Sequence, residues 1–131
     1  MKRLRVLALS VSVAAATTAL ACLAHGHAEH GGEFAEVDEY TFELCPLRQG
    51  ETTTFSLWIK DPAQKPVTAG DVTLKLRLSG ERTATIALKP TGSGSFSGTM
   101  SGLRRGRYRA SADLLLKGRA KLTPGFSVKV P

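Results

Sequence analysis

Apolar and polar residues alternate with a period of two through most of the chain after residue 39. In the clearest run, residues 72–78, the apolar positions are Val or Leu and the intervening ones are Thr73, Lys75 and Arg77. Successive side chains of a β-strand point to opposite faces, so this period predicts strands with one buried face. No segment has the helical period. The pattern predicts seven short strands, within residues 40–44, 55–60, 72–78, 84–88, 96–100, 107–114 and 126–130.

Turn-forming residues separate these strands: Pro62 and Pro66 in one connection, and Gly50, Gly80 and Gly118 in others. Strands that each have one apolar face bury those faces most simply by stacking two sheets. The fold class is therefore predicted to be all-β, an immunoglobulin-like antiparallel β-sandwich over residues 40–131. The expected core consists of Phe42, Phe55, Leu57, Leu74, Leu76, Ile86, Tyr108, Leu114 and Val128.

Two aromatic residues have structural interpretations. Tyr108 follows Gly106 at a strand start, and its hydroxyl is expected to bond to the backbone and lock a corner. Trp58 falls on the strand face opposite Phe55 and Leu57, so it is expected to pack under a loop.

The first 24 residues have the pattern of a secretory signal peptide. Lys2, Arg3 and Arg5 precede an apolar stretch that ends in the cleavage pattern Ala19-Leu20-Ala21, while a single membrane span is the alternative. Cleavage before Cys22 would leave a lipid-modified cysteine, whereas cleavage after residue 24 would make His25 the N-terminus. The protein is therefore expected to be periplasmic or anchored to the envelope.

Residues 25–39 are predicted to be a flexible arm rich in histidines and acids. It holds all three histidines of the chain, and short His-rich tracts are typical of metal binding. An N-terminal His25 would also offer a square-planar nitrogen set suited to Cu(II) or Ni(II). The other interpretation is a solvated acidic tether with incidental histidines. The predicted ligands of a copper or zinc ion are His25, His27, His30, Glu29 and Glu33.

Charge is unevenly distributed. Residues 25–43 carry six acids and no base, whereas residues 44–131 carry fifteen Lys or Arg side chains against five acids. The basic residues, including Arg104, Arg105, Arg107 and Arg109, form either a solvated sheet face or a surface for an anion. An exported chain is not expected to bind nucleic acid, so lipid head groups, the acidic arm or an acidic protein remain as partners.

The two cysteines leave alternatives open. Cys45 is interpreted as a packed apolar side chain, or as the partner of Cys22 in a disulfide suited to an oxidising compartment. No catalytic or cofactor-binding residues are predicted, because residues 40–131 contain no histidine that could serve a Ser or Cys nucleophile. They also contain no phosphate-binding glycine loop and no closed Cys/His zinc motif.

Residues 55–78 have the form strand, D-x-x-x-x-P-V-x-x-x-x-V, strand, and residues 103–108 form an L-x-x-G-x-Y corner. Both motifs resemble those of the YtkA-like and FixH-like bacterial immunoglobulin-like domains and of the sandwich module beside periplasmic adaptors of heavy-metal efflux pumps. The resemblance covers roughly residues 40–131. The Gly-Met-rich segment of YtkA-like domains is missing, because Met100 is the only methionine after Met1.

Two functions are consistent with the sequence. The first is a periplasmic metal-binding accessory of a heavy-metal or copper efflux or homeostasis system, with the arm supplying the ligands. The second is a non-catalytic interaction module that docks on an envelope protein complex.

Overall fold

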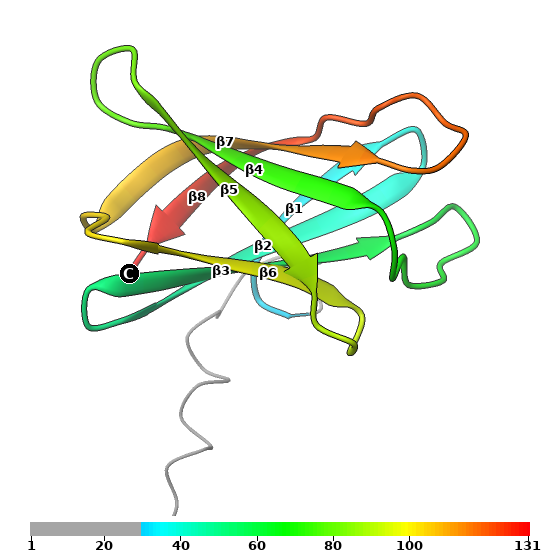
Figure 1. Ribbon diagram of the computed structural model, residues 1–131, viewed down its shortest axis with the longest axis horizontal. Helices are drawn as coiled ribbons and strands as arrows, with labels where there is room; N and C mark the ends of the chain where they lie inside the picture. The colour runs from blue at the N-terminus through cyan, green and yellow to red at the C-terminus, as the bar shows by residue number, and fades with distance from the viewer. Residues whose placement is uncertain (1–29) are drawn as a thin grey trace, which may run out of the picture.

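The computed structural model describes residues 30–131, which form eight β-strands and no α-helix (Figure 1). The predicted signal peptide, its cleavage alternatives and Cys22 lie outside the described residues. Within residues 30–131 there is no helix with the length and hydropathy needed to cross a bilayer. The strands are β1 (Glu33–Val37), β2 (Tyr40–Gln49), β3 (Thr52–Lys60), β4 (Asp71–Arg77), β5 (Thr83–Pro90), β6 (Ser95–Ser101), β7 (Gly106–Leu115) and β8 (Gly125–Val130).

All neighbouring strands are antiparallel, in the order β1-β2-β3-β6-β5-β4-β7-β8. The link between β6 and β5 is short, with only Lys89↔Ser97 and Pro90↔Phe96 in register. This link divides the sheet into a first half (β1, β2, β3 and β6) and a second half (β5, β4, β7 and β8). The sheet curls at the link, so that its two halves face each other (Figure 1).

The curled sheet is nearly closed, because β8 lies against β1 and β2. Arg119, in the β7–β8 loop, crosses this seam: its Nη1 donates to the Tyr40 hydroxyl at 2.9 Å, and its guanidinium lies 5.1 Å from the Tyr40 ring centre. At the link between β6 and β5, in the middle of the strand order, Gly98 permits the sharp bend between the halves. A Cβ there would lie 2.7 Å from the Ala87 carbonyl oxygen and 2.8 Å from the Leu88 side chain.

The core fills the space between the two halves, as the alternating pattern requires. Eight of the nine predicted core residues are buried, and Tyr108 is half-buried against the same cluster. Burying one apolar face of each strand supplies the main favourable free energy of folding. The predicted all-β class and the predicted strand faces are confirmed.

The sequence predicts seven strands, and the structure has eight. The additional strand is β1, whose residues Glu33–Val37 fall inside the segment assigned to the flexible arm. They pair with β2 through a two-residue turn in which Asp38 and Glu39 have φ of 51° and 67°. Positive φ at both central residues matches the twist of a hairpin, but sequences at such turns usually contain glycine. Because this turn contains two acids and no glycine, the sequence pattern did not indicate a hairpin here.

Tyr108 forms the predicted corner. Its hydroxyl donates to the Arg104 carbonyl oxygen at 2.6 Å, which fixes the β6–β7 connection against the start of β7. Leu103 in the same connection is buried.

Candidate functional site

Three residues form a row across the outward face of the first half of the sheet. Phe34 in β1 is in register with Glu43 in β2, and Glu43 is in register with Trp58 in β3. Their neighbours along the strands, such as Phe42 and Leu57, point into the core. Trp58 therefore points away from the core, as predicted. Phe34 is 47% exposed, and among the large apolar side chains of residues 30–131 only Leu115 is exposed to a similar extent.

Glu43 fastens the segment that precedes β1 to this face. Its side-chain Oε2 accepts a hydrogen bond from the backbone N–H of His30 and another from the backbone N–H of Gly32, each at 2.7 Å. Hydrogen bonds to a carboxylate are about twice as strong as neutral ones. They compensate for the desolvation of Glu43, which is only 6% exposed. Gly32 has to be glycine, because a Cβ there would collide with the Leu44 carbonyl oxygen.

His30 is held at its side chain as well as at its backbone. Its ring stacks on the indole of Trp58, with the ring centres 4.0 Å apart and the planes 13° from parallel. The carboxylate of Glu43 and the indole of Trp58 thus fix His30 from two directions.

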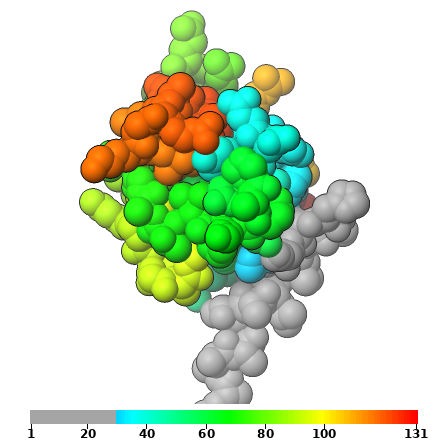
Figure 2. Space-filling model, turned by 90° about the vertical axis from the view of Figure 1, so that its right-hand side faces the viewer, coloured from blue at the N-terminus to red at the C-terminus, as the bar shows by residue number. Residues whose placement is uncertain are grey.

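A hollow of about 230 Å³ opens beside this stack. Phe34, Glu43 and Trp58 line it from the strands, His30 lines it from the segment before β1, and Gln64 lines it from the β3–β4 loop. Asp61 holds this loop in place, because its Oδ1 accepts hydrogen bonds from the backbone N–H groups of residues 63 and 65, each at 2.9 Å. Figure 2 looks onto this end of the molecule, where the β3–β4 loop lies between the β1–β2 hairpin and the β7–β8 loop.

Of the five predicted metal ligands, the structure describes two. His25, His27 and Glu29 lie outside the described residues. His30 is docked on Trp58, whereas Glu33 is an exposed residue of β1 that faces the opposite side of the strand from Phe34. Residues 30–131 contain no group of three His, Cys, Asp or Glu side chains placed to hold a metal ion. The carboxylate that the structure brings to His30 is Glu43.

Sequence reasoning missed the role of Glu43. The signal available was a single acid between Phe42 and Leu44, which places it on the outward face with Trp58. Its proximity to His30 depends on the register of three strands.

Cys45 lies on the same outward face and is in register with Ser56. It is buried and disulfide-bonded. Cys22 is the only other cysteine of the sequence. Cys45 is therefore packed, as expected, but it is not a lone thiol: of the two alternatives, the structure shows the disulfide-bonded one.

No family model matches this sequence, and comparisons with curated proteins and with solved structures found no similar protein. Function is therefore inferred from the side chains themselves. The outward face of the first half combines an imidazole held in place, an exposed aromatic ring and a hollow between them. These features suit the binding of a metal ion by the histidine arm or the docking of an apolar side chain.

Proposed function

We propose that this protein is an exported, non-catalytic metal-binding accessory of a copper or heavy-metal efflux or homeostasis system. His25, His27 and His30, with Glu29 and Glu33, bind a divalent copper or zinc ion. The β-sheet domain serves as a rigid support in the periplasm or at the envelope, where it meets a protein partner.

The observation that carries this proposal is the docked state of His30. Its imidazole stacks on Trp58 through one ring face, and neither ring nitrogen is hydrogen-bonded to any of residues 30–131. A ligand arm loses conformational entropy when it coordinates a metal, and that loss opposes binding. Because folding already fixes the position of His30, this residue loses little further conformational entropy when it coordinates a metal. His30 would thus be the first ligand.

The likeness to YtkA-like and FixH-like domains belongs to the same proposal. An immunoglobulin-like sandwich is supported by the antiparallel pairing, by the two halves of the sheet that face each other, and by the bond from the Tyr108 hydroxyl to Arg104. In such a domain the metal ligands would lie outside the sandwich core.

The test is a titration of the exported protein with Cu(II) and Zn(II). Binding is monitored by calorimetry and by the fluorescence of Trp58, the only tryptophan of the chain. A Cu(II) ion on His30 would lie close to the indole, so saturable quenching is expected. Replacing His25, His27 and His30 by Ala should abolish both binding and quenching. A matched variant, Glu36→Gln with Glu39→Gln, removes two nearby carboxylates outside the ligand set and should leave both unchanged. Undiminished affinity in the triple histidine variant would refute the arm as the site.

A second candidate function is an interaction module. It is favoured by Phe34, which is 47% exposed next to the hollow of about 230 Å³. Exposed aromatic residues beside a pocket are typical anchors of protein interfaces. Phe34→Ser would then abolish docking on the envelope partner while metal affinity stays the same. If the protein has no metal affinity at all, this candidate remains.

A further inference from the structure

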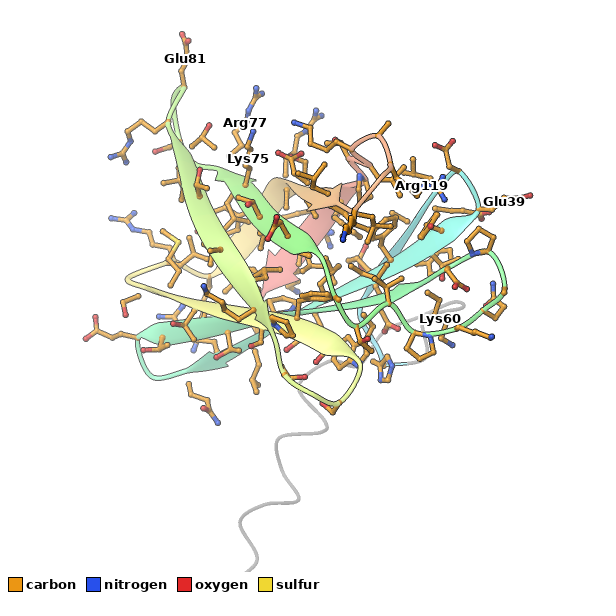
Figure 3. The ribbon with its side chains drawn as sticks, turned by 45° about the vertical axis from the view of Figure 1, so that its right-hand side comes forward. Glu39, Lys60, Lys75, Arg77, Glu81 and Arg119 are labelled. Carbon is orange, nitrogen blue, oxygen red and sulfur yellow. The ribbon has the colours of Figure 1, made fainter. Side chains whose placement is uncertain are left out.

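The outward face of the second half of the sheet is strongly basic, and the metal site makes no use of it. Lys75 and Arg77 of β4 point to the same side, away from the first half (Figure 3). Arg107 and Arg109 of β7 lie on the same face, and so does Lys129 of β8. These five cations form what we call the basic face.

Little of this charge is neutralised within residues 30–131. Two acids share this face of β4 and β7. Asp71 lies at the start of β4, in register with Leu115, and Asp113 Oδ2 lies 3.3 Å from Lys75 Nζ and 3.9 Å from Lys121 Nζ. Arg77, Arg109 and Lys129 form no ion pair with any described residue. Glu81 does not form an ion pair with Arg77, because its side chain points outward at the tip of the β4–β5 turn (Figure 3).

The unpaired cations are also neighbours across the strands. Arg107 is in register with Lys129, and the pairing of Leu76 with Ala110 places Arg77 beside Arg109. Like charges opposite each other on adjacent strands destabilise a sheet. A hollow of about 320 Å³ lies between Lys75, Arg77 and Arg109, with the hydroxyl groups of Thr83 and Ser111 in its lining. An anion bound there would relieve the repulsion.

The make-up of the face distinguishes between kinds of anionic partner. The outward residues among the cations are Thr73, Thr85, Ala87, Ser111 and Ser127. Protein interfaces rely on aromatic or large apolar anchors. The exposed Leu115 of this face lies at the end of β7, in register with Asp71 and beyond Asp113, so no such anchor stands between the cations. The cations extend over three strands, which is more than one small anion can contact. A surface with many phosphates meets all of them at once.

We propose that the basic face binds the phosphate head groups of an anionic lipid bilayer. Basic side chains near such a surface gain electrostatic free energy without inserting into the hydrocarbon. Glu39, in the acidic β1–β2 turn, lies well away from Lys75 and Arg77 (Figure 3). The bound protein would therefore lie with the second half of its sheet on the membrane and the His30–Trp58 site directed away from it. This inference does not depend on the metal-binding proposal.

The experiment is co-sedimentation with vesicles. Protein expressed from the full chain, with its processed form identified by intact mass, is mixed with vesicles of phosphatidylglycerol and phosphatidylcholine, or of phosphatidylcholine alone. We expect binding only to the anionic vesicles, and weaker binding as salt is raised. Each basic residue near an anionic surface raises the partition coefficient for the vesicles about fivefold, so Arg77→Ser with Arg109→Ser should lower that coefficient about 25-fold.

The matched control is Lys65→Ser with Lys117→Ser, which removes the same charge from the β3–β4 and β7–β8 loops and should change partitioning only slightly. Equal losses in the two double variants would overturn the proposal, because net charge alone would then explain binding. Absence of wild-type binding to the anionic vesicles at low salt would overturn it as well. If the wild type binds polyglutamate but no vesicles, and Arg77→Ser with Arg109→Ser abolishes that binding, the partner is an acidic protein and the lipid proposal fails.

Discussion

At the scale of single residues, a buried carboxylate decides where the segment before β1 lies. Glu43 accepts two backbone hydrogen bonds, from His30 and Gly32, and it is nearly inaccessible to solvent. A buried N–H group without an acceptor lowers the free energy of unfolding by more than an average hydrogen bond raises it. The reason is that the group has lost its hydrogen bond to water and has gained no other. The position of His30 on Trp58 therefore depends on Glu43.

Replacing Glu43 by Ala tests this dependence. The variant leaves two backbone N–H groups without an acceptor, and we expect the free energy of unfolding to fall by about 1–3 kcal/mol. Trp58 should lose its stacked imidazole and become more exposed, with a red shift of its fluorescence emission. Urea denaturation and the emission spectrum measure the two effects. Glu36→Ala, at an exposed position of β1, is the control and should change neither. An unshifted emission spectrum in Glu43→Ala would mean that the stack holds His30 without the carboxylate.

A core residue gives a second test at this scale. Leu76 is fully buried between the halves of the sheet. Leu76→Ala removes apolar contacts and leaves a cavity, so the free energy of unfolding should fall by about 2–5 kcal/mol. Thr85→Ala, on the outward face of β5, should change it by less than about 0.5 kcal/mol. Equal effects of the two substitutions in urea denaturation would contradict the assigned strand faces.

At the scale of elements, the alternation of apolar and polar residues was sufficient to locate seven of the eight strands. The run at residues 72–78 corresponds to β4 (Asp71–Arg77), and the pattern from residue 107 corresponds to β7 (Gly106–Leu115). These strands each have one clear apolar face, and a local pattern reveals it. β1 was missed because four of the seven residues from Glu33 to Glu39 are acids, and its turn contains no glycine. The site was found only in part, because the row of Phe34, Glu43 and Trp58 exists only in the paired register.

The β1–β2 turn yields a prediction at this scale. Glu39 adopts φ of 67°, a conformation that favours glycine. Glu39→Gly should relieve this strain and raise the free energy of unfolding by about 0.5–1 kcal/mol, even after the greater freedom of glycine in the unfolded chain is counted. Glu36→Gly is the matched control: it places glycine inside a strand, where it should be destabilising by a similar amount. Thermal denaturation of the two variants should shift in opposite directions, and a lower midpoint for Glu39→Gly would refute the assigned turn.

At the scale of the whole molecule, the two outward faces of the curled sheet differ in chemistry. The first half presents the docked His30, the exposed Phe34 and the hollow beside Trp58. The second half presents mainly cations and small polar residues, with Asp71, Asp113 and the exposed Leu115 toward one end. The core holds the halves at a fixed separation, and Arg119 bridges the seam to Tyr40. A partner bound to one face therefore leaves the other face accessible, so metal binding and membrane binding are compatible in one molecule.

The disulfide of Cys45 connects this arrangement to the processing of the chain. Cys45 is disulfide-bonded, and Cys22 is the only other cysteine of the sequence, so we predict that the exported protein keeps Cys22 and pairs it with Cys45. The thiol of Cys22 could then carry no lipid, and cleavage could not fall after residue 24, which would also exclude a Cu(II) site at an N-terminal His25.

Peptide mapping without reductant should recover one cross-linked species, and reductant should separate it into two. Closing a loop of this size contributes about 3 kcal/mol, so Cys45→Ser should lower the thermal midpoint. A mature protein that begins at His25, or one with a lipid on Cys22, would contradict the prediction and leave Cys45 to pair between chains.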